Sequence, residues 1–87
     1  MAWTIELDGD ARKTLKKLDK AAAQQIVRKL REIGTLSDPT DMGRPLTANR
    51  KGFWAYRVGD YRLVCEIQRQ KIVVMVLEIR HRSEAYR

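Results

Sequence analysis

The chain has 87 residues, enough for one small domain spanning residues 1–87. Its 18 Lys and Arg residues exceed its 11 Asp and Glu residues, and the net charge of +7 favours nucleic acid, an anionic membrane surface or an acidic protein as partner. No stretch approaches the roughly 20 apolar residues of a membrane-spanning helix. Cys65 is the only cysteine, so an internal disulfide is excluded, and a reduced thiol fits a cytoplasmic location. With one histidine and one cysteine, no metal site or cofactor is expected.

The start of the chain predicts a strand followed by a helix. Residues 2–7 alternate in polarity, which is typical of a strand that buries one face. Asp8 or Asp10 is then expected to cap a helix, because an aspartate accepts hydrogen bonds from the backbone N–H groups at a helix start. The apolar stripe of this helix has leucines but no aromatic residue, a pattern that argues against a membrane partner.

A second helix and a long loop follow. Asp19 is the expected N-cap of a helix over residues 20–33, and Gly34 is the expected residue just after its end. The two helices should form an antiparallel hairpin. Residues 35–52 contain both prolines and predict a loop with a short extended piece near Leu46. Loops of this length in small domains are often functional.

The remaining residues predict three strands, over 53–58, 61–67 and 71–79. The last is apolar on both faces, which is typical of a central strand covered by helices. Gly59-Asp60 predicts a type II′ hairpin turn, and Arg69-Gln70 or a neighbouring pair is expected to close the next hairpin. The predicted fold is α+β in the order β-α-α-β-β-β, an antiparallel twisted sheet with the N-terminal helical hairpin packed on one face.

The Gly59-Asp60 turn also predicts where two arginines lie. With these two residues as the loop, Arg57 pairs directly with Arg62, and direct partners in a strand pair point to the same face. Like charges placed opposite each other are unfavourable, so we expect an anion or a carboxylate of the chain, such as Glu66, between them. A solvated arginine pair is the alternative. Arg80 ends the adjacent strand, so three arginines are expected to meet in one patch.

More basic and titratable residues come from the long loop and from the end of the chain. Arg50 and Lys51 in the loop, and Arg82 at the end, are candidates for RNA binding, because Lys and Arg bind phosphate groups. His81 can move a proton near neutral pH, and Tyr86 can stack on a base or share its hydroxyl proton. The alternative is a solvated basic tail.

These residue types suit a phosphodiester of RNA, which carries its own nucleophile, the 2′-hydroxyl. A protein can promote cleavage by orienting this hydroxyl, bracing the phosphate and neutralising the charge that develops. Arginines supply the electrostatic part of this catalysis without a metal. The sequence contains neither a Walker loop nor a Ser-His-Asp set.

Two motifs resemble the RelE/ParE superfamily of toxins from type II toxin-antitoxin systems. They are Tyr61-Arg62-Leu63-Val64 and, after an apolar strand, the ending Arg80-His81-Arg82-Ser83-Glu84-Ala85-Tyr86. The RelE branch is the more similar. The resemblance implies a ribosome-dependent endoribonuclease that cleaves mRNA in the A site by attack of the 2′-hydroxyl. It also implies a cognate antitoxin that covers the basic surface and through which the toxin-antitoxin complex binds operator DNA.

The resemblance also implies roles for single residues. Arg62 matches the arginine that braces the phosphate, Arg80 matches the arginine that stabilises the transition state, and Tyr86 matches the tyrosine that orients or stacks on the cleaved nucleotide. Arg57 matches a lysine of the best-known members.

One position departs from the family pattern. Ala55 stands where those members have a second lysine, which removes one group proposed to transfer a proton. His81 is a candidate to compensate for it, and a surface histidine that contacts RNA or Glu84 is the alternative.

Two other functions are considered beside the nuclease. A ParE-like poison of DNA gyrase would share the fold and cleave nothing. Such a protein would not need Arg57, Arg62, Arg80 and Tyr86 on one surface, so this set of residues favours the nuclease. The third possibility is a small basic binding module without toxicity.

Overall fold

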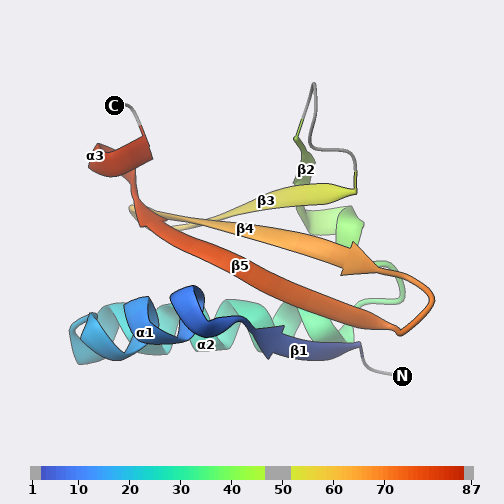
Figure 1. The fold of residues 1–87 in the computed structure, drawn as a ribbon, viewed down its shortest axis with the longest axis horizontal. Coiled ribbons are helices and arrows are strands. Elements are labelled where there is room, and N and C mark those ends of the chain that lie inside the picture. Colours follow the sequence, from blue (N-terminus) through green and yellow to red (C-terminus); the bar gives the residue numbers. More distant parts are fainter. Residues whose placement is uncertain (1–2, 47–51, 86–87) are drawn as a thin grey trace.

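The computed structural model describes residues 3–46 and 52–85 (Figure 1). Its N-terminal part contains strand β1 (Thr4–Leu7) and helices α1 (Gly9–Lys17) and α2 (Lys20–Thr35). Asp8, and not Asp10, caps α1, and its carboxylate accepts a hydrogen bond from the N–H of Ala11 at 3.0 Å. Asp19 caps α2 as predicted. Both helices therefore begin where a short polar side chain satisfies a free backbone N–H group.

Helix α2 is two residues longer than predicted, and Gly34 lies inside it instead of following its end. The prediction of Gly34 as the residue after the helix was therefore wrong. The reason for a glycine at this position is a close approach to the first strand. A Cβ atom on Gly34 would lie 3.1 Å from the carbonyl oxygen of Trp3, and the Trp3 N–H donates to the Gly34 carbonyl at 2.7 Å.

The C-terminal part contains most of the sheet. Its elements are the 3₁₀ helix η1 (Pro39–Met42), the strands β2 (Arg44–Pro45), β3 (Phe53–Val58), β4 (Tyr61–Gln68) and β5 (Val73–His81), and the one-turn helix α3 (Arg82–Ala85). Strand β2 corresponds to the extended piece predicted near Leu46. The second hairpin has a four-residue turn, 69–72, instead of a two-residue one, so β5 begins two residues later than predicted.

The five strands lie in the order β1-β5-β4-β3-β2. The pairs β2-β3, β3-β4 and β4-β5 are antiparallel, whereas β1 and β5 are parallel to each other. The α+β fold class is confirmed, and the wholly antiparallel sheet is corrected to a mixed one. Strands β1 and β5 are distant in the sequence, so no hairpin turn between them imposes an antiparallel direction. Strand β5 is an interior strand, between β1 and β4, as its apolar character predicted.

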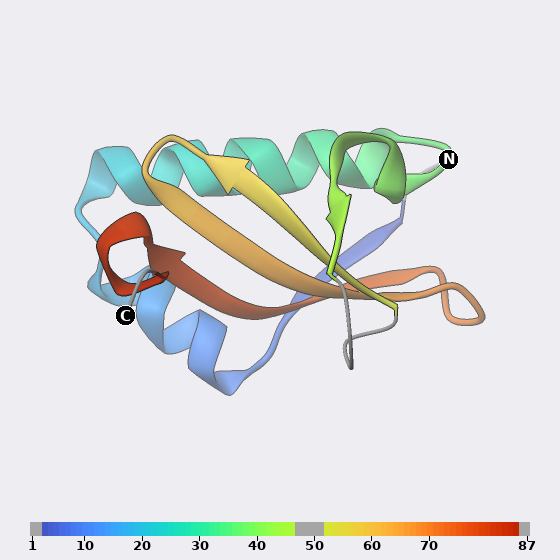
Figure 2. The same cartoon turned by 90° about the horizontal axis from the view of Figure 1, so that it is seen from above.

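Both long helices lie on one face of the sheet, as predicted (Figures 1 and 2). The core between the two layers contains Ile26, Leu30 and Ile33 of α2. From the sheet it contains the inward side chains of the three long strands, among them Tyr56, Leu63, Cys65, Val74, Val76 and Ile79. Neither long helix covers the opposite face of the sheet, so that face is accessible to solvent or to a partner.

A bulge decides which face the end of β5 presents. Val64 pairs with Glu78, but Cys65 pairs with Val76, so Leu77 is an extra residue on β5. Before the bulge Val76 points into the core, and strict alternation would then point Glu78 inward too. The extra residue reverses the alternation. Ile79 points inward and Arg80 points to solvent.

Candidate functional site

Three arginines lie side by side across three adjacent strands. Arg57 of β3 is the direct partner of Arg62 of β4, and Arg62 is the direct partner of Arg80 of β5. All three side chains are exposed, and we call them the arginine row. Gly59 has a φ of 56°, which a type II′ turn needs at its first residue, so the predicted turn and the predicted pairing of Arg57 with Arg62 are confirmed.

The charges of the arginine row are only partly compensated. Arg80 forms an ion pair with Glu78, Nε to Oε1 at 3.0 Å, near the surface. Glu66, the carboxylate considered as an internal partner of Arg57 and Arg62, does not lie between them. Glu66 accepts a hydrogen bond from Gln68 at 2.8 Å. It lies four residues after Arg62 on β4, opposite Phe53 of β3. Within the described part of the chain neither Arg57 nor Arg62 has an ion-pair partner. Two adjacent guanidinium groups are thus available to an anion.

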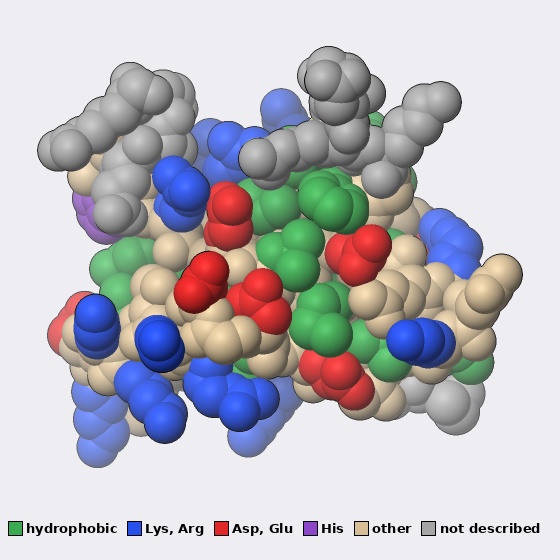
Figure 3. Space-filling view, in the orientation of Figure 1, with side chains coloured by type: hydrophobic (Ala, Val, Ile, Leu, Met, Phe, Trp, Pro, Cys, Tyr) green, Lys and Arg blue, Asp and Glu red, His purple; other side chains and the backbone are tan. Residues whose placement is uncertain are grey.

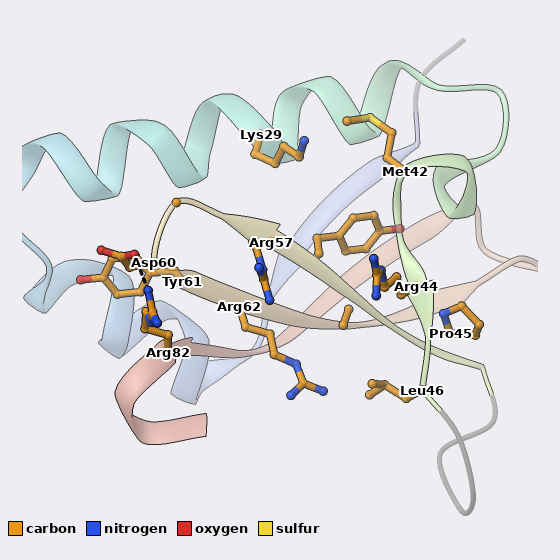
Figure 4. A pocket seen from close by; sticks show the side chains of 13 residues that line it. Lys29, Met42, Arg44, Pro45, Leu46, Arg57, Asp60, Tyr61, Arg62 and Arg82 are labelled. Carbon is orange, nitrogen blue, oxygen red and sulfur yellow. Dashed lines mark ion pairs between the residues drawn. The ribbon is translucent and has the colours of Figure 1, made fainter. Parts of the chain in front are cut away.

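A hollow of about 700 Å³ lies beside the arginine row, between α2, β2 and β3 (Figure 4). Five cationic side chains line it: Lys29, Arg44, Arg57, Arg62 and Arg82. They come from five different segments, which meet only in the folded chain. Guanidinium groups keep their charge at any physiological pH, so this wall presents fixed positive charge.

Arg44 was not among the residues predicted from the sequence. It lies on β2, opposite Ala55 of β3, at the edge of the sheet. Ala55 shares a face with Arg57, two residues further along the strand, so Arg44 adds a cation beside the arginine row. Its position depends on the pairing of a two-residue strand with β3, and no local pattern in residues 35–52 indicates that pairing.

Tyr56 holds the segment that carries Arg44. Its ring is buried, and its hydroxyl donates a hydrogen bond to the carbonyl of Pro39 at 2.7 Å. Burial raises the pKa of Tyr56, so the hydroxyl stays protonated at neutral pH. The hydroxyl therefore positions η1 and β2 and is a poor candidate for proton transfer.

His81 lies on the other side of β5 from Arg80. Adjacent residues in a strand alternate in direction, and His81 is the direct partner of Tyr61, one residue before Arg62. The rings of Tyr61 and His81 meet edge to face, with centroids 5.2 Å apart. Strand alternation in the sequence was the signal that could have separated His81 from the arginine row. Its role in proton transfer stays a prediction.

Arg82 is attached to the turn between β3 and β4. Its backbone N–H donates to the carbonyl of Asp60 at 2.7 Å, and its guanidinium lies 3.8 Å from the Asp60 carboxylate. Both side chains are exposed, so the ion pair itself adds little stability. Arg82 lines the hollow, whereas Arg50, Lys51 and Tyr86 lie outside the described residues.

The face shown in Figure 3 has a different composition from the hollow with its five cationic side chains. Acidic and apolar side chains share its middle, and Lys and Arg side chains gather below them, on the helical side. Among the described residues no group of three His, Cys, Asp or Glu side chains is placed to hold a metal ion. None of the helices in the described ranges has the length and apolar character needed to cross a bilayer.

The sequence of the chain matches those of known proteins. Residues 5–86 match the family described as ParE toxin of type II toxin-antitoxin system, parDE. Toxin RelG of Mycobacterium tuberculosis is 32% identical over 88 residues, which cover 100% of this chain and 99% of that protein.

Solved structures are also similar. The toxin-antitoxin complex RelBE2 of M. tuberculosis contains a chain with a TM-score of 0.84 and 26% identity, covering 95% of this chain and 94% of that one. An E. coli RelE toxin in the free state, carrying two arginine-to-alanine mutations, has a TM-score of 0.77 and 25% identity, covering 98% of this chain and 87% of that one.

Proposed function

The chain belongs to the RelE/ParE superfamily of type II toxin-antitoxin toxins, and from this membership we propose that it is a ribosome-dependent endoribonuclease that cleaves mRNA. In this proposal the toxin enters the A site of the ribosome, needs no metal, and acts in the cytoplasm, where it inhibits translation. The 2′-hydroxyl of the RNA is the nucleophile, and the protein positions the reacting groups.

The observation that carries the proposal is the arginine row. Three like charges side by side on a sheet repel one another, and such an arrangement is favourable when an anion lies over it. The register places Arg57, Arg62 and Arg80 together, and only Arg80 has a carboxylate partner among the described residues. A phosphodiester supplies the missing negative charge.

The proposed roles rest on the resemblance to the superfamily, and the placement of the arginine row supports those of its three members. Arg62, at the centre of the row, braces the phosphate, and Arg57 supports it from the neighbouring strand. Arg80 stabilises the charge of the transition state, and Tyr86 orients or stacks on the cleaved nucleotide. Arg44 and Arg82, which line the hollow, hold the flanking RNA backbone. Arg50 and Lys51 are proposed to bind RNA as well.

The test is a primer-extension map of mRNA on purified, programmed ribosomes. We expect cleavage in the A-site codon when the protein is added, and none of the naked mRNA. Arg62→Ala should abolish most of the cleavage. Arg31→Ala removes the same charge from the groove between the helices and should leave cleavage unchanged. Intact mRNA on ribosomes with the wild-type toxin would contradict the proposal.

A second candidate function is poisoning of DNA gyrase, because the matching family is described as a ParE toxin. It predicts inhibited supercoiling and trapped, cleaved DNA in a purified gyrase assay, with mRNA left intact on ribosomes. The arginine row favours the nuclease, since a gyrase poison needs no set of arginines for a phosphodiester. The two assays, run on one preparation, decide between them.

The proposed partner is a cognate antitoxin, as in the RelBE2 complex, with an acidic or amphipathic segment over the arginine row. The complex would bind operator DNA through the antitoxin. Hydrogen exchange should show protection of β3 and β4 when the antitoxin binds. Protection confined to the helical face would contradict direct covering of the row.

A further inference from the structure

The imidazole of His81 accepts hydrogen bonds from the residue two places after it. The backbone N–H of Ser83 lies 3.2 Å from Nδ1 of His81, and the Ser83 hydroxyl lies 2.9 Å from the same atom. A backbone N–H can only donate, so Nδ1 carries the lone pair. The proton of the neutral ring is therefore on Nε2.

This contact is the cap of a helix start. His81 is the last residue of β5, Arg82 begins α3, and Ser83 is the second residue of α3. A side-chain acceptor at the residue before a helix normally satisfies the N–H of the second or third helical residue. His81 does this with Nδ1, where Asp8 and Asp19 do it with carboxylates at α1 and α2.

Neighbouring contacts hold the ring and the turn in this arrangement. The ring of Tyr61 packs edge to face against the imidazole and restricts its rotation. The backbone N–H of Arg82 donates to the carbonyl of Asp60 at 2.7 Å, which fixes the first residue of α3 to the turn between β3 and β4. The direction in which the chain leaves β5 is thus set by contacts with Asp60 and Tyr61, at the start of β4.

We propose that His81 is a positioning residue, which caps α3 through Nδ1 and so fixes the direction in which α3 leaves the end of β5. Its effect on cleavage rests on the proposed function, whereas the cap itself does not. This role differs from proton transfer, because Nδ1 is occupied by Ser83 and the side chain lies on the opposite side of the strand from Arg80.

Three substitutions separate the cap from proton transfer. In His81→Asn the side-chain oxygen lies near the position of Nδ1, and asparagine is among the best capping residues. In His81→Gln the amide lies further out, near the position of Nε2, and does not reach the N–H of Ser83 in the same way. His81→Ala removes both. None of the three variants can transfer a proton near neutral pH.

Two measurements test the inference. The first is hydrogen exchange at the Ser83 amide by NMR, where loss of a cap should speed exchange by about fivefold. The second is single-turnover mRNA cleavage on programmed ribosomes. We expect His81→Asn to keep slow exchange and wild-type cleavage. His81→Gln and His81→Ala should lose both, with a larger fall in the maximal single-turnover rate than rise in the toxin concentration that gives half of that rate.

Other results would overturn the inference. Equal exchange in all four proteins would show that His81 is not a cap. Slow exchange with lost cleavage in His81→Asn would show that the imidazole itself is needed for cleavage. Changed exchange with unchanged cleavage would remove the positioning role. If the wild type cleaves no mRNA, the proposed function fails, and the exchange data still decide the cap.

Discussion

Gly43 lies so close to the ring of Tyr56 that a Cβ atom at this position would be 2.9 Å from Cε1 and Cζ. The hydroxyl of the same tyrosine donates a hydrogen bond to the carbonyl of Pro39, the first residue of η1. These two contacts attach η1 and β2 to the sheet. They thereby place Arg44 at the wall of the hollow, beside the arginine row.

Gly43→Ala should therefore destabilise the fold. The ring of Tyr56 is buried and cannot move away freely, so overpacking should lower the free energy of unfolding by about 1–3 kcal/mol. Denaturant unfolding followed by circular dichroism measures this change. Gly9→Ala is the matched control, because a Cβ there meets nothing within 4 Å and alanine favours the helix. Equal stability of both variants would show that the ring of Tyr56 leaves room for a Cβ atom at position 43.

Arg62→Ala should weaken RNA binding without weakening the fold. Arg62 is exposed between two other arginines, so its removal relieves repulsion, and the melting temperature should stay constant or rise slightly. Loss of one phosphate contact should reduce the salt dependence of binding, with the slope of log K against log salt smaller by about one. Binding to ribosomes at several salt concentrations measures this. An unchanged slope would place Arg62 outside the RNA interface.

Arg80→Ala should affect catalysis more than stability. Arg80 is exposed and its only recorded ion pair among the described residues, with Glu78, is a surface pair worth about 0–1 kcal/mol. Removal of a preorganised donor to a transition state typically slows a reaction by about 10²–10³-fold. Single-turnover cleavage and thermal unfolding of the same variant give both quantities. If Arg80→Ala lost cleavage only in proportion to a lowered melting temperature, Arg80 would be needed for folding and not for catalysis.

Tyr86 is proposed to stack on the cleaved nucleotide or to orient its 2′-hydroxyl, and substitution separates the two. Tyr86→Ala should lose cleavage in either case. Tyr86→Phe keeps the ring, so retained cleavage would indicate stacking and lost cleavage would indicate the hydroxyl. Single-turnover rates on programmed ribosomes provide the comparison. Full activity of the alanine variant would contradict both roles.

Asp38 should make stability depend on pH in the acidic range. Its carboxylate accepts hydrogen bonds from the hydroxyl and the N–H of Thr40, at 2.7 and 3.0 Å, and these bonds, with Arg69, lower the pKa of Asp38. The stabilisation is complete above the unfolded pKa of about 3.9 and is lost as the pH falls through the lower folded pKa. Thermal unfolding of wild type and Asp38→Asn should therefore converge at acidic pH and differ at neutral pH. Asp41→Asn, in the 3₁₀ helix that Asp38 caps, is the charge-matched control. A constant difference between wild type and Asp38→Asn at all pH values would contradict the prediction.

Cys65 should be inert in the folded protein. Its side chain is fully buried, and burial raises the pKa of the thiol to about 12. Very little thiolate is then present at about pH 8, where a free cysteine reacts readily. We expect labelling by a thiol reagent only at the rate of unfolding, and rapid labelling in denaturant. Rapid labelling of the native protein would show that β4 opens locally.

Several features of the fold and site were predictable because they depend on neighbouring residues. Asp8 and Asp19 cap the helices that follow them, and the Gly59-Asp60 turn sets the pairing of Arg57 with Arg62. A tight turn leaves only one register for its two strands, so the sequence alone was sufficient there. The motifs near Arg62 and Arg80 likewise indicated the superfamily before the fold was known.

Other features depend on contacts between distant segments. The parallel pairing of β1 with β5, the place of Arg44 opposite Ala55 and the extra residue Leu77 in β5 have no local signal. The bulge is the clearest case, because residues 72–77 are apolar on both faces and do not show which side chains point inward. Only packing against the helices decides that Val76 and Ile79 both face the core. The tertiary structure, and not the sequence pattern, therefore turns Arg80 toward Arg62.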